Sequence, residues 1–466
     1  MKPAGSRLPA RGFWLPAPGF WLPAPGFWLP APGSRLPVLA ALLAGGVMIT
    51  AQAPPPDPLR SVAERYVKLV LAVGQHDADY VDAFYGPAEW RKAAEAAKTP
   101  LATIDSQAAT LEADLTTTGV TPPSKAEAEL WGLRRQYLAR QLASMRARIG
   151  MLQGKKLTFD EESLALYDAV APVKPESEFE AVLKQLEARL PGEGSLIDRY
   201  DRYKRAFVIP KPRVDRVFQE AIRACRQRMS FVDLPTGETF RVEYVTGKSW
   251  SGYNWYQGNF KSLIQVNTDL PIYIDRAIDL ACHEGYPGHH VYNALLEKNL
   301  VKDRGWIEFT IYALFSPQSL IAEGTANYGI EVAFPPADRL RLEQDVLFPL
   351  AGLDPAKVAG YYDVLALVDR LSYAGNEAAR RYINGELNRE STVAWLEKYA
   401  MYTRPRAEQR VRFIDQYRSY VINYNLGKDL VRAYIERKAG RDRTPERRWR
   451  EFTALLSSPR LPSGLR

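Results

Sequence analysis

The segment IDLACHEGYPGHHVYNALL, residues 278–296, contains three of the four histidines of this chain, within eight residues of one another. In a helix each residue turns about 100° and rises about 1.5 Å. His283 and His289 are six residues apart, so an unbroken helix would point them in different directions, roughly 240° apart. His283 and His290 would share a face but lie about 10 Å apart along the axis. A continuous helix therefore cannot bring two of these imidazoles to one metal ion.

Pro287 and Gly288 stand between the histidines and offer a way around this restriction. Proline lacks a backbone N–H and clashes with the carbonyl four residues earlier, while glycine accepts backbone angles that other residues avoid. We therefore predict a local break that swings His289 back towards His283. The alternative is a helix that simply ends at Tyr286, with surface histidines at the start of the next helix.

Two imidazoles need a third protein ligand to form a catalytic zinc site, whose fourth position is left for water. The best candidate is Glu323, in SLIAEGTANYGIEVAF. Its small neighbours Ala322, Gly324 and Ala326 would allow a second helix to approach closely. A glutamate on a helix is, by itself, more often a solvated surface residue.

The composition is that of a soluble globular protein, with 46% hydrophobic and 25% charged residues. The formal net charge is +8, but the arginines are scattered among acidic residues along amphipathic segments. This pattern predicts solvated helix faces and no nucleic-acid partner. Two cysteines are too few for a disulfide framework. We expect Cys282 to be a small buried apolar residue, and a Cys225–Cys282 bridge stays open if the protein is exported.

Three regions are predicted along the chain. Residues 1–36 carry PAPGFWL repeats, which are too rich in proline and glycine for helix or strand and are excluded from the fold. Residues 37–53 combine a short apolar run with small residues, which predicts a signal peptide or N-terminal anchor and a periplasmic or secreted protein without a stable membrane span unless this segment is retained. Residues 54–466 are predicted to form a single, mainly α-helical domain. A small β element is expected at 239–268, next to the histidine segment.

The motifs HEGYPGHH, EGTANY and NYNLG resemble those of a bacterial family called domain of unknown function 885. The similarity covers roughly residues 240–435. The family is helical and exported, and its members are regarded as zincin-like zinc metallopeptidases. The resemblance therefore implies a zincin-like domain that binds Zn²⁺.

Carried over to this chain, the resemblance implies His283, His289 and Glu323 as the zinc ligands. Glu284 would be the general base, as in other H-E motifs. Tyr424 would stabilise the oxyanion.

Several alternatives stay open at this stage. His290 either supports His289 or replaces it as a ligand, and Tyr328 and Tyr420 are further candidates for the oxyanion donor. The expected substrate is a peptide or a small amide. A zinc amidase or esterase with a non-peptide substrate is one alternative function, and a non-enzymatic periplasmic metal-binding protein is another.

Overall fold

A computed structural model describes residues 57–119, 122, 124–248, 250–442 and 444–466. Contacts between Cα atoms group Pro55–Arg466 into one compact unit. The predictions for residues 1–36 and 37–53 lie outside the described residues. The described chain is mainly α-helical with a few short strands, which confirms the predicted fold class.

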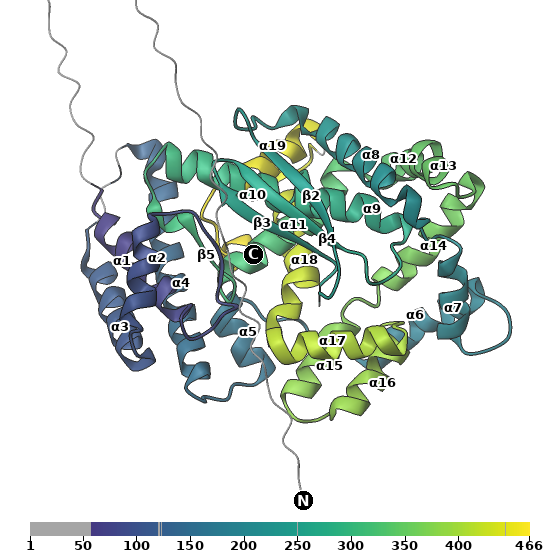
Figure 1. Cartoon of the computed structure of the whole chain (residues 1–466), viewed down its shortest axis with the longest axis horizontal. Helices are drawn as coiled ribbons and strands as arrows, with labels where there is room; N and C mark the ends of the chain where they lie inside the picture. The colour runs from purple at the N-terminus through teal and green to yellow at the C-terminus, as the bar shows by residue number, and fades with distance from the viewer. Residues whose placement is uncertain (1–56, 120–121, 123, 249, 443) are drawn as a thin grey trace, which may run out of the picture. The chain divides into compact units, whose positions relative to one another are not determined.

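The elements are labelled in Figure 1, where colour follows the chain from purple through teal and green to yellow. The helices before the main sheet are α1 (Arg60–Val73), α2 (Ala88–Ala97), α3 (Leu101–Thr117), η1 (Lys125–Glu127), α4 (Ala128–Leu152), α5 (Phe159–Tyr167), α6 (Glu176–Arg189), α7 (Leu196–Arg205), η2 (Lys211–Arg213), α8 (Val214–Gln227) and η3 (Arg228–Phe231). Those after it are α9 (Ile274–Leu280), η4 (Ala281–Gly285), α10 (His289–Leu296), η5 (Glu297–Lys302), η6 (Ile307–Thr310), α11 (Pro317–Ala333), α12 (Pro336–Leu342), η7 (Glu343–Leu347), α13 (Phe348–Ala351), η8 (Pro355–Lys357), α14 (Val358–Asp369), α15 (Ala374–Ile383), α16 (Arg389–Tyr399), α17 (Arg404–Tyr417), η9 (Arg418–Val421), α18 (Ile422–Ala439), α19 (Pro445–Leu456) and η10 (Pro462–Leu465).

The predicted β element is a three-stranded sheet in the order β2-β4-β3. Its strands are β2 (Thr239–Val245), β3 (Gly252–Gly258) and β4 (Lys261–Asn267). Strand β4 pairs with β3 antiparallel and with β2 parallel, so β3 lies at an edge. The sheet immediately precedes α9, as expected from the alternating apolar and polar residues.

A second, two-stranded sheet was not predicted. Strand β1 (Val81–Phe84) pairs antiparallel with β5 (Ile311–Ala313). Strands of three or four residues are too short to show the alternating period that would distinguish them from their helical neighbours. The pairing brings the N-terminal part of the unit against the segment that leads into α11.

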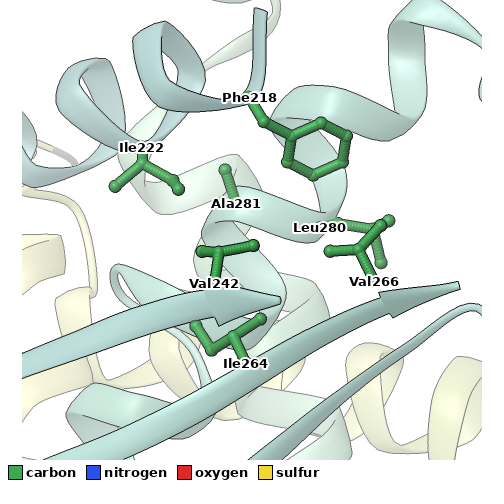
Figure 2. A pocket seen from close by; sticks show the side chains of 7 residues that line it. All are labelled: Phe218, Ile222, Val242, Ile264, Val266, Leu280 and Ala281. Atoms are coloured by element: carbon green, nitrogen blue, oxygen red, sulfur yellow. The ribbon is translucent and has the colours of Figure 1, made fainter. Parts of the chain in front are cut away.

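One face of the three-stranded sheet packs on the helices that lead to the histidines. Val242 and Ile264 of the sheet face Phe218 of α8 and Leu280 and Ala281 (Figure 2). The gap between them is lined entirely by apolar side chains and measures about 10 Å³, room for at most one water. It is a packing seam that fixes α9 and η4 on the sheet, and it is too small for a substrate.

Helices α11 and α18 cross at two glycines. A Cβ atom on Gly324 would lie 2.5 Å from the carbonyl carbon of Gly427, and one on Gly427 would lie 2.8 Å from the carbonyl oxygen of Leu320. Any larger side chain would force the two backbones apart. The close approach of another helix at the small residues around Glu323 was predicted, and it is confirmed.

Candidate metal centre

The helix that carries His283 is broken in the predicted place. Helix α9 passes into the π-helical turn η4, which ends at Gly285, and α10 begins at His289. A cis peptide bond joins Tyr286 to Pro287. A Cβ atom on Gly288 would lie 1.8 Å from the carbonyl oxygen of His283, so only glycine allows this close backbone approach.

The break turns two histidines towards each other. The Nε2 atoms of His283 and His289 are 3.1 Å apart, and the rings meet edge to face. His289 does begin the next helix, as in the alternative considered above, but its imidazole is not a surface group: only 14% of the side chain is exposed. The six-residue spacing is therefore compatible with the binding of one metal ion by both histidines.

Glu323 reaches the same point from α11. Its Oε2 atom lies 3.3 Å from Nε2 of His283 and 3.7 Å from Nε2 of His289. This oxygen is buried and has no hydrogen-bond partner among the described residues. The other carboxylate oxygen, Oε1, accepts a hydrogen bond of 2.9 Å from the Tyr420 hydroxyl. The structure thus brings together the three side chains that the sequence pattern singled out as ligands.

The three atoms fit a zinc ion. Zinc–ligand bonds of about 2.0–2.1 Å in tetrahedral geometry place neighbouring ligand atoms roughly 3.3 Å apart. The observed separations are 3.1, 3.3 and 3.7 Å. Two histidines and one glutamate are also a ligand set that catalytic zinc sites use, with the fourth position left for water. The orphaned oxygen of Glu323 is the group that such an ion would satisfy.

The imidazoles and the Glu323 carboxylate stabilise each other's charged forms. Burial lowers the pKa of His289, but the nearby Glu323 carboxylate and the charge of Glu284 outweigh it and raise this pKa to about 9. Burial raises the pKa of Glu323, but the two imidazoles outweigh it and hold this pKa well below its usual value. Glu323 is therefore an ionised carboxylate that draws positive charge to the site.

Glu284 is a second carboxylate at the cluster. One of its oxygens and a ring nitrogen of each histidine all lie within 4.8 Å of one another, whereas Oε2 of Glu323 lies 3.3 and 3.7 Å from the two imidazoles. Its backbone carbonyl accepts a hydrogen bond of 2.7 Å from Asn254 of β3. A Cβ atom on Gly252 would lie 2.9 Å from Oε1 of Glu284, so the carboxylate rests against the backbone of the edge strand. These distances suit Glu323 as a ligand and Glu284 as a neighbouring base.

The three candidate tyrosines have different surroundings. Tyr420 donates to Glu323, and Tyr328 donates to Glu436 at 3.1 Å, away from the cluster. The Tyr424 hydroxyl has no protein hydrogen-bond partner among the described residues, and its ring lies 5.8 Å from that of Tyr420. Burial and the charge of Glu323 hold the pKa of Tyr424 well above its usual value. Tyr424 therefore keeps a protonated, available hydroxyl beside the site, whereas Tyr420 supports Glu323.

His290 points away from the cluster. Its Nε2 atom lies 2.8 Å from Oε2 of Glu238, and its Nδ1 atom lies 2.9 Å from the Ser262 hydroxyl. Glu238 also binds Arg226 and accepts a hydrogen bond of 2.8 Å from Tyr286. Both ring nitrogens of His290 are thus occupied, and the residue anchors the start of α10 to the sheet.

Cys282 is buried, as expected, and the bridge that the sequence left open is present. Cys282, directly before His283, forms a disulfide with Cys225 of α8. The Cα atoms are 5.8 Å apart, within the range that disulfides require. The packing of α8 on η4 brings the two thiols together, although they are separated by 57 positions in the sequence. The bridge ties η4, the turn that carries His283, to α8.

Asp82 is a residue near the site that the sequence analysis missed. It lies on β1 and accepts a hydrogen bond from the Tyr253 hydroxyl of β3. Burial raises the pKa of Asp82 to about 6, against the opposing effects of Tyr253 and the nearby His289. No local motif marks this aspartate, because only the unpredicted pairing of β1 with β5 carries it to the site.

Comparisons with known proteins give distant similarities. No described protein family and no curated protein matches the sequence. A protein from Colwellia psychrerythraea described as a lipoprotein is 13% identical with a TM-score of 0.47, over 78% of this chain and 65% of that one. The M32 carboxypeptidase from Deinococcus radiodurans R1 is 12% identical with a TM-score of 0.35, over 86% of this chain and 90% of that one. Both TM-scores are below 0.5, and neither similarity assigns a function.

Proposed function

We propose that this protein is an exported zinc metallopeptidase. The observation that supports this most is the convergence of three side chains, one each from η4, α10 and α11, on one point. Oε2 of Glu323 is buried, has no hydrogen-bond partner in the part of the chain that the structure describes, and lies within 3.7 Å of both imidazoles. A buried carboxylate of this kind costs free energy unless a cation or a hydrogen bond compensates it.

Each residue around the ligands has a role in this proposal. Zinc, when bound by His283, His289 and Glu323, supplies a Lewis acid that lowers the pKa of water to about 7. Glu284 is placed to accept the proton of the attacking water and to pass it to the leaving amine. Tyr424 is placed to donate a hydrogen bond to the oxygen of the carbonyl as negative charge develops there.

Strand β3 offers a place for an extended peptide. Among the described residues it pairs with β4 on one side only, and its first residue, Gly252, contacts the Glu284 carboxylate. An extended peptide that adds to this edge would gain main-chain hydrogen bonds and would present its carbonyls near Glu284. This arrangement favours a peptide over a small non-peptide amide or ester.

The proposed location outside the cytoplasm is supported by the disulfide Cys225–Cys282. Disulfides persist in oxidising compartments and are rare in the cytosol. No helix in the described part of the chain is long and apolar enough to cross a membrane.

The proposal is tested by zinc analysis together with digestion of a peptide library. We expect Glu284→Gln to keep stoichiometric zinc and to lose cleavage by about a thousandfold or more, because the base is removed but the ligands are intact. Glu323→Gln is expected to lose zinc and cleavage together. Glu331→Gln is the matched control on the same helix, since Glu331 forms ion pairs with Arg432 and Lys428. Stoichiometric zinc without any cleavage that depends on Glu284 would contradict the proposal.

A further inference from the structure

Helix α17 places an arginine beside the candidate metal centre. Ala407 and Val411 are fully buried and fix the inner face of this helix. Arg410 flanks that face, and its guanidinium carbon lies 4.8 Å from the ring centre of Phe413 and 5.9 Å from that of Tyr424. Arg410 is therefore separated from the cluster by a single tyrosine side chain.

Arg410 has no carboxylate partner. Its Nε atom is buried without a hydrogen bond, and it takes part in no ion pair among the described residues. Arg404, on the same helix, contrasts with it by pairing with the glutamates Glu390, Glu397 and Glu408. Partly buried charges are normally paired, because water no longer compensates them fully. The guanidinium of Arg410 is thus available to an anion from outside the chain.

Further cations extend this positive region. The guanidinium carbon of Arg406 lies 4.9 Å from the ring centre of Tyr402, and Nζ of Lys204 lies 4.3 Å from that of Tyr273. Neither cation forms an ion pair in the described part of the chain. Burial raises the pKa of Tyr402, but the charges of Arg406, Arg410 and Lys204 outweigh it and lower this pKa. Asp275 and Asp279 act on Lys204, so the unpaired positive charge of this region is that of Arg406 and Arg410.

Tyr424 joins this region to the catalytic groups. The charges that act on its hydroxyl are those of Glu323, Arg410 and Glu284. A carbonyl held at Tyr424 would therefore lie close to both Glu284 and Arg410. One extended residue spans about 3.5 Å, so a group bound at Arg410 belongs to a residue adjacent to that carbonyl.

Building on the proposed metallopeptidase function, we propose that Arg410 binds a carboxylate of the substrate, on the residue that follows the cleaved bond. The planar fork of an arginine suits a carboxylate, which it binds with two parallel hydrogen bonds. The carboxylate has two possible sources: the C-terminal carboxylate of a peptide, or an acidic side chain at the same residue. The shared prediction is that an anion on this residue promotes binding and cleavage.

Three matched peptides test the proposal and separate the two sources. They share one N-terminal part, taken from the best substrate in the library digest, and end in phenylalanine, phenylalanine amide or glutamic acid amide. We expect kcat/KM for the phenylalanine peptide, the glutamic acid amide peptide or both to exceed that for the phenylalanine amide by tenfold or more. Arg410→Gln should lower kcat/KM for the favoured peptides about tenfold to a hundredfold, the effect of a lost charge-assisted hydrogen bond. The phenylalanine amide should be cleaved by Arg410→Gln as by the wild type.

Two further variants check that the effect comes from the charge at this position. Arg410→Lys should recover part of the preference, because it keeps the charge but not the fork. Arg412→Gln is the matched control: it removes an exposed arginine two residues along α17, about 200° around the helix. It should leave all three rates unchanged. Equal cleavage of the three peptides by the wild type, or an equal loss for all three in Arg410→Gln, would overturn the proposal.

A binding measurement keeps this result separate from the proposed function. Affinities of the phenylalanine and phenylalanine amide peptides are measured with the zinc-loaded Glu284→Gln variant, with and without Arg410→Gln. We expect the carboxylate to improve binding about tenfold or more only when Arg410 is present. Equal affinities would overturn the role of Arg410 even if cleavage depends on Glu284. A preference for the carboxylate without any cleavage by the wild type would support Arg410 and count against the metallopeptidase.

Discussion

His289 and His290 are neighbours in the sequence but have opposite surroundings. Nε2 of His289 lies 3.1 Å from Nε2 of His283. The carboxylates of Glu323 and Glu284 lie close to it and favour a positive charge there. His290 is fully buried and uses both ring nitrogens inside the protein, with Glu238 and Ser262. The difference arises because α10 begins at His289, and successive residues of a helix point about 100° apart.

This contrast gives a prediction for zinc content. His289→Ala should lose stoichiometric zinc, because a site with two protein ligands holds the ion far more weakly. His290→Asn should keep zinc but lower the free energy of unfolding by about 1–3 kcal/mol, since Glu238 loses a buried hydrogen-bond partner. Zinc analysis and urea denaturation measure the two effects. Loss of zinc in His290→Asn with full retention in His289→Ala would reverse the assignment of these residues.

At the scale of elements, the site depends on how closely α11 and α18 approach. Glu323 lies on α11, while Tyr424 lies on α18 and Tyr420 on the adjoining η9. Gly324 and Gly427 let the two backbones touch beside these residues. Helix pairs that meet at small residues hold side chains on the two elements at fixed distances, because their backbones cannot slide without a clash.

We therefore expect Gly324→Ala to disturb both stability and the site. The added Cβ would lie 2.5 Å from the backbone of Gly427, and overpacking of this kind costs about 1–3 kcal/mol. Zinc affinity should fall about tenfold, because Glu323 moves relative to Tyr420. Gly375→Ala is the matched control, since a Cβ there meets nothing within 4 Å. Unchanged stability and zinc affinity in Gly324→Ala would show that the crossing does not hold the ligand in place.

At the scale of the whole molecule, the disulfide joins parts of the chain that are far apart in sequence. It joins α8 to η4 across 57 positions of the sequence, and the three-stranded sheet lies within this loop. Cross-linking such a loop reduces the conformational freedom of the unfolded chain more than that of the native one. The bridge thus stabilises the association of α8, the sheet and η4.

Replacing both cysteines by alanine should lower the free energy of unfolding by about 2–5 kcal/mol, with about 4 kcal/mol expected for a loop of this length. Thermal unfolding with and without a reducing agent measures the effect. The reducing agent should lower the Tm of the wild type and leave that of the double variant unchanged. Two titratable thiols in the unfolded, non-reduced wild type would show that the bridge is absent.

Local sequence patterns were enough to predict the mainly helical fold, the β element before α9 and the break at Pro287 and Gly288. These features follow from local rules: the apolar period, the missing N–H of proline and the freedom of glycine act within a few residues. The spacing of His283 and His289 was informative for the same reason, since helix geometry forbids a shared metal ion unless the helix breaks. Glu323 was found because its small neighbours and its motif are also local.

Contacts between distant elements determine which groups surround that local framework, and local patterns do not reveal them. These contacts separate Tyr424 from Tyr420, pair Cys282 with Cys225, carry Asp82 to the site and leave Arg410 without a partner. Each of these outcomes depends on contacts between elements distant in the sequence, such as the crossing of α11 with α18 and the pairing of β1 with β5. Such contacts are selected by the packing of the whole domain, and a tyrosine or an arginine has no local pattern that reveals which neighbour it will meet.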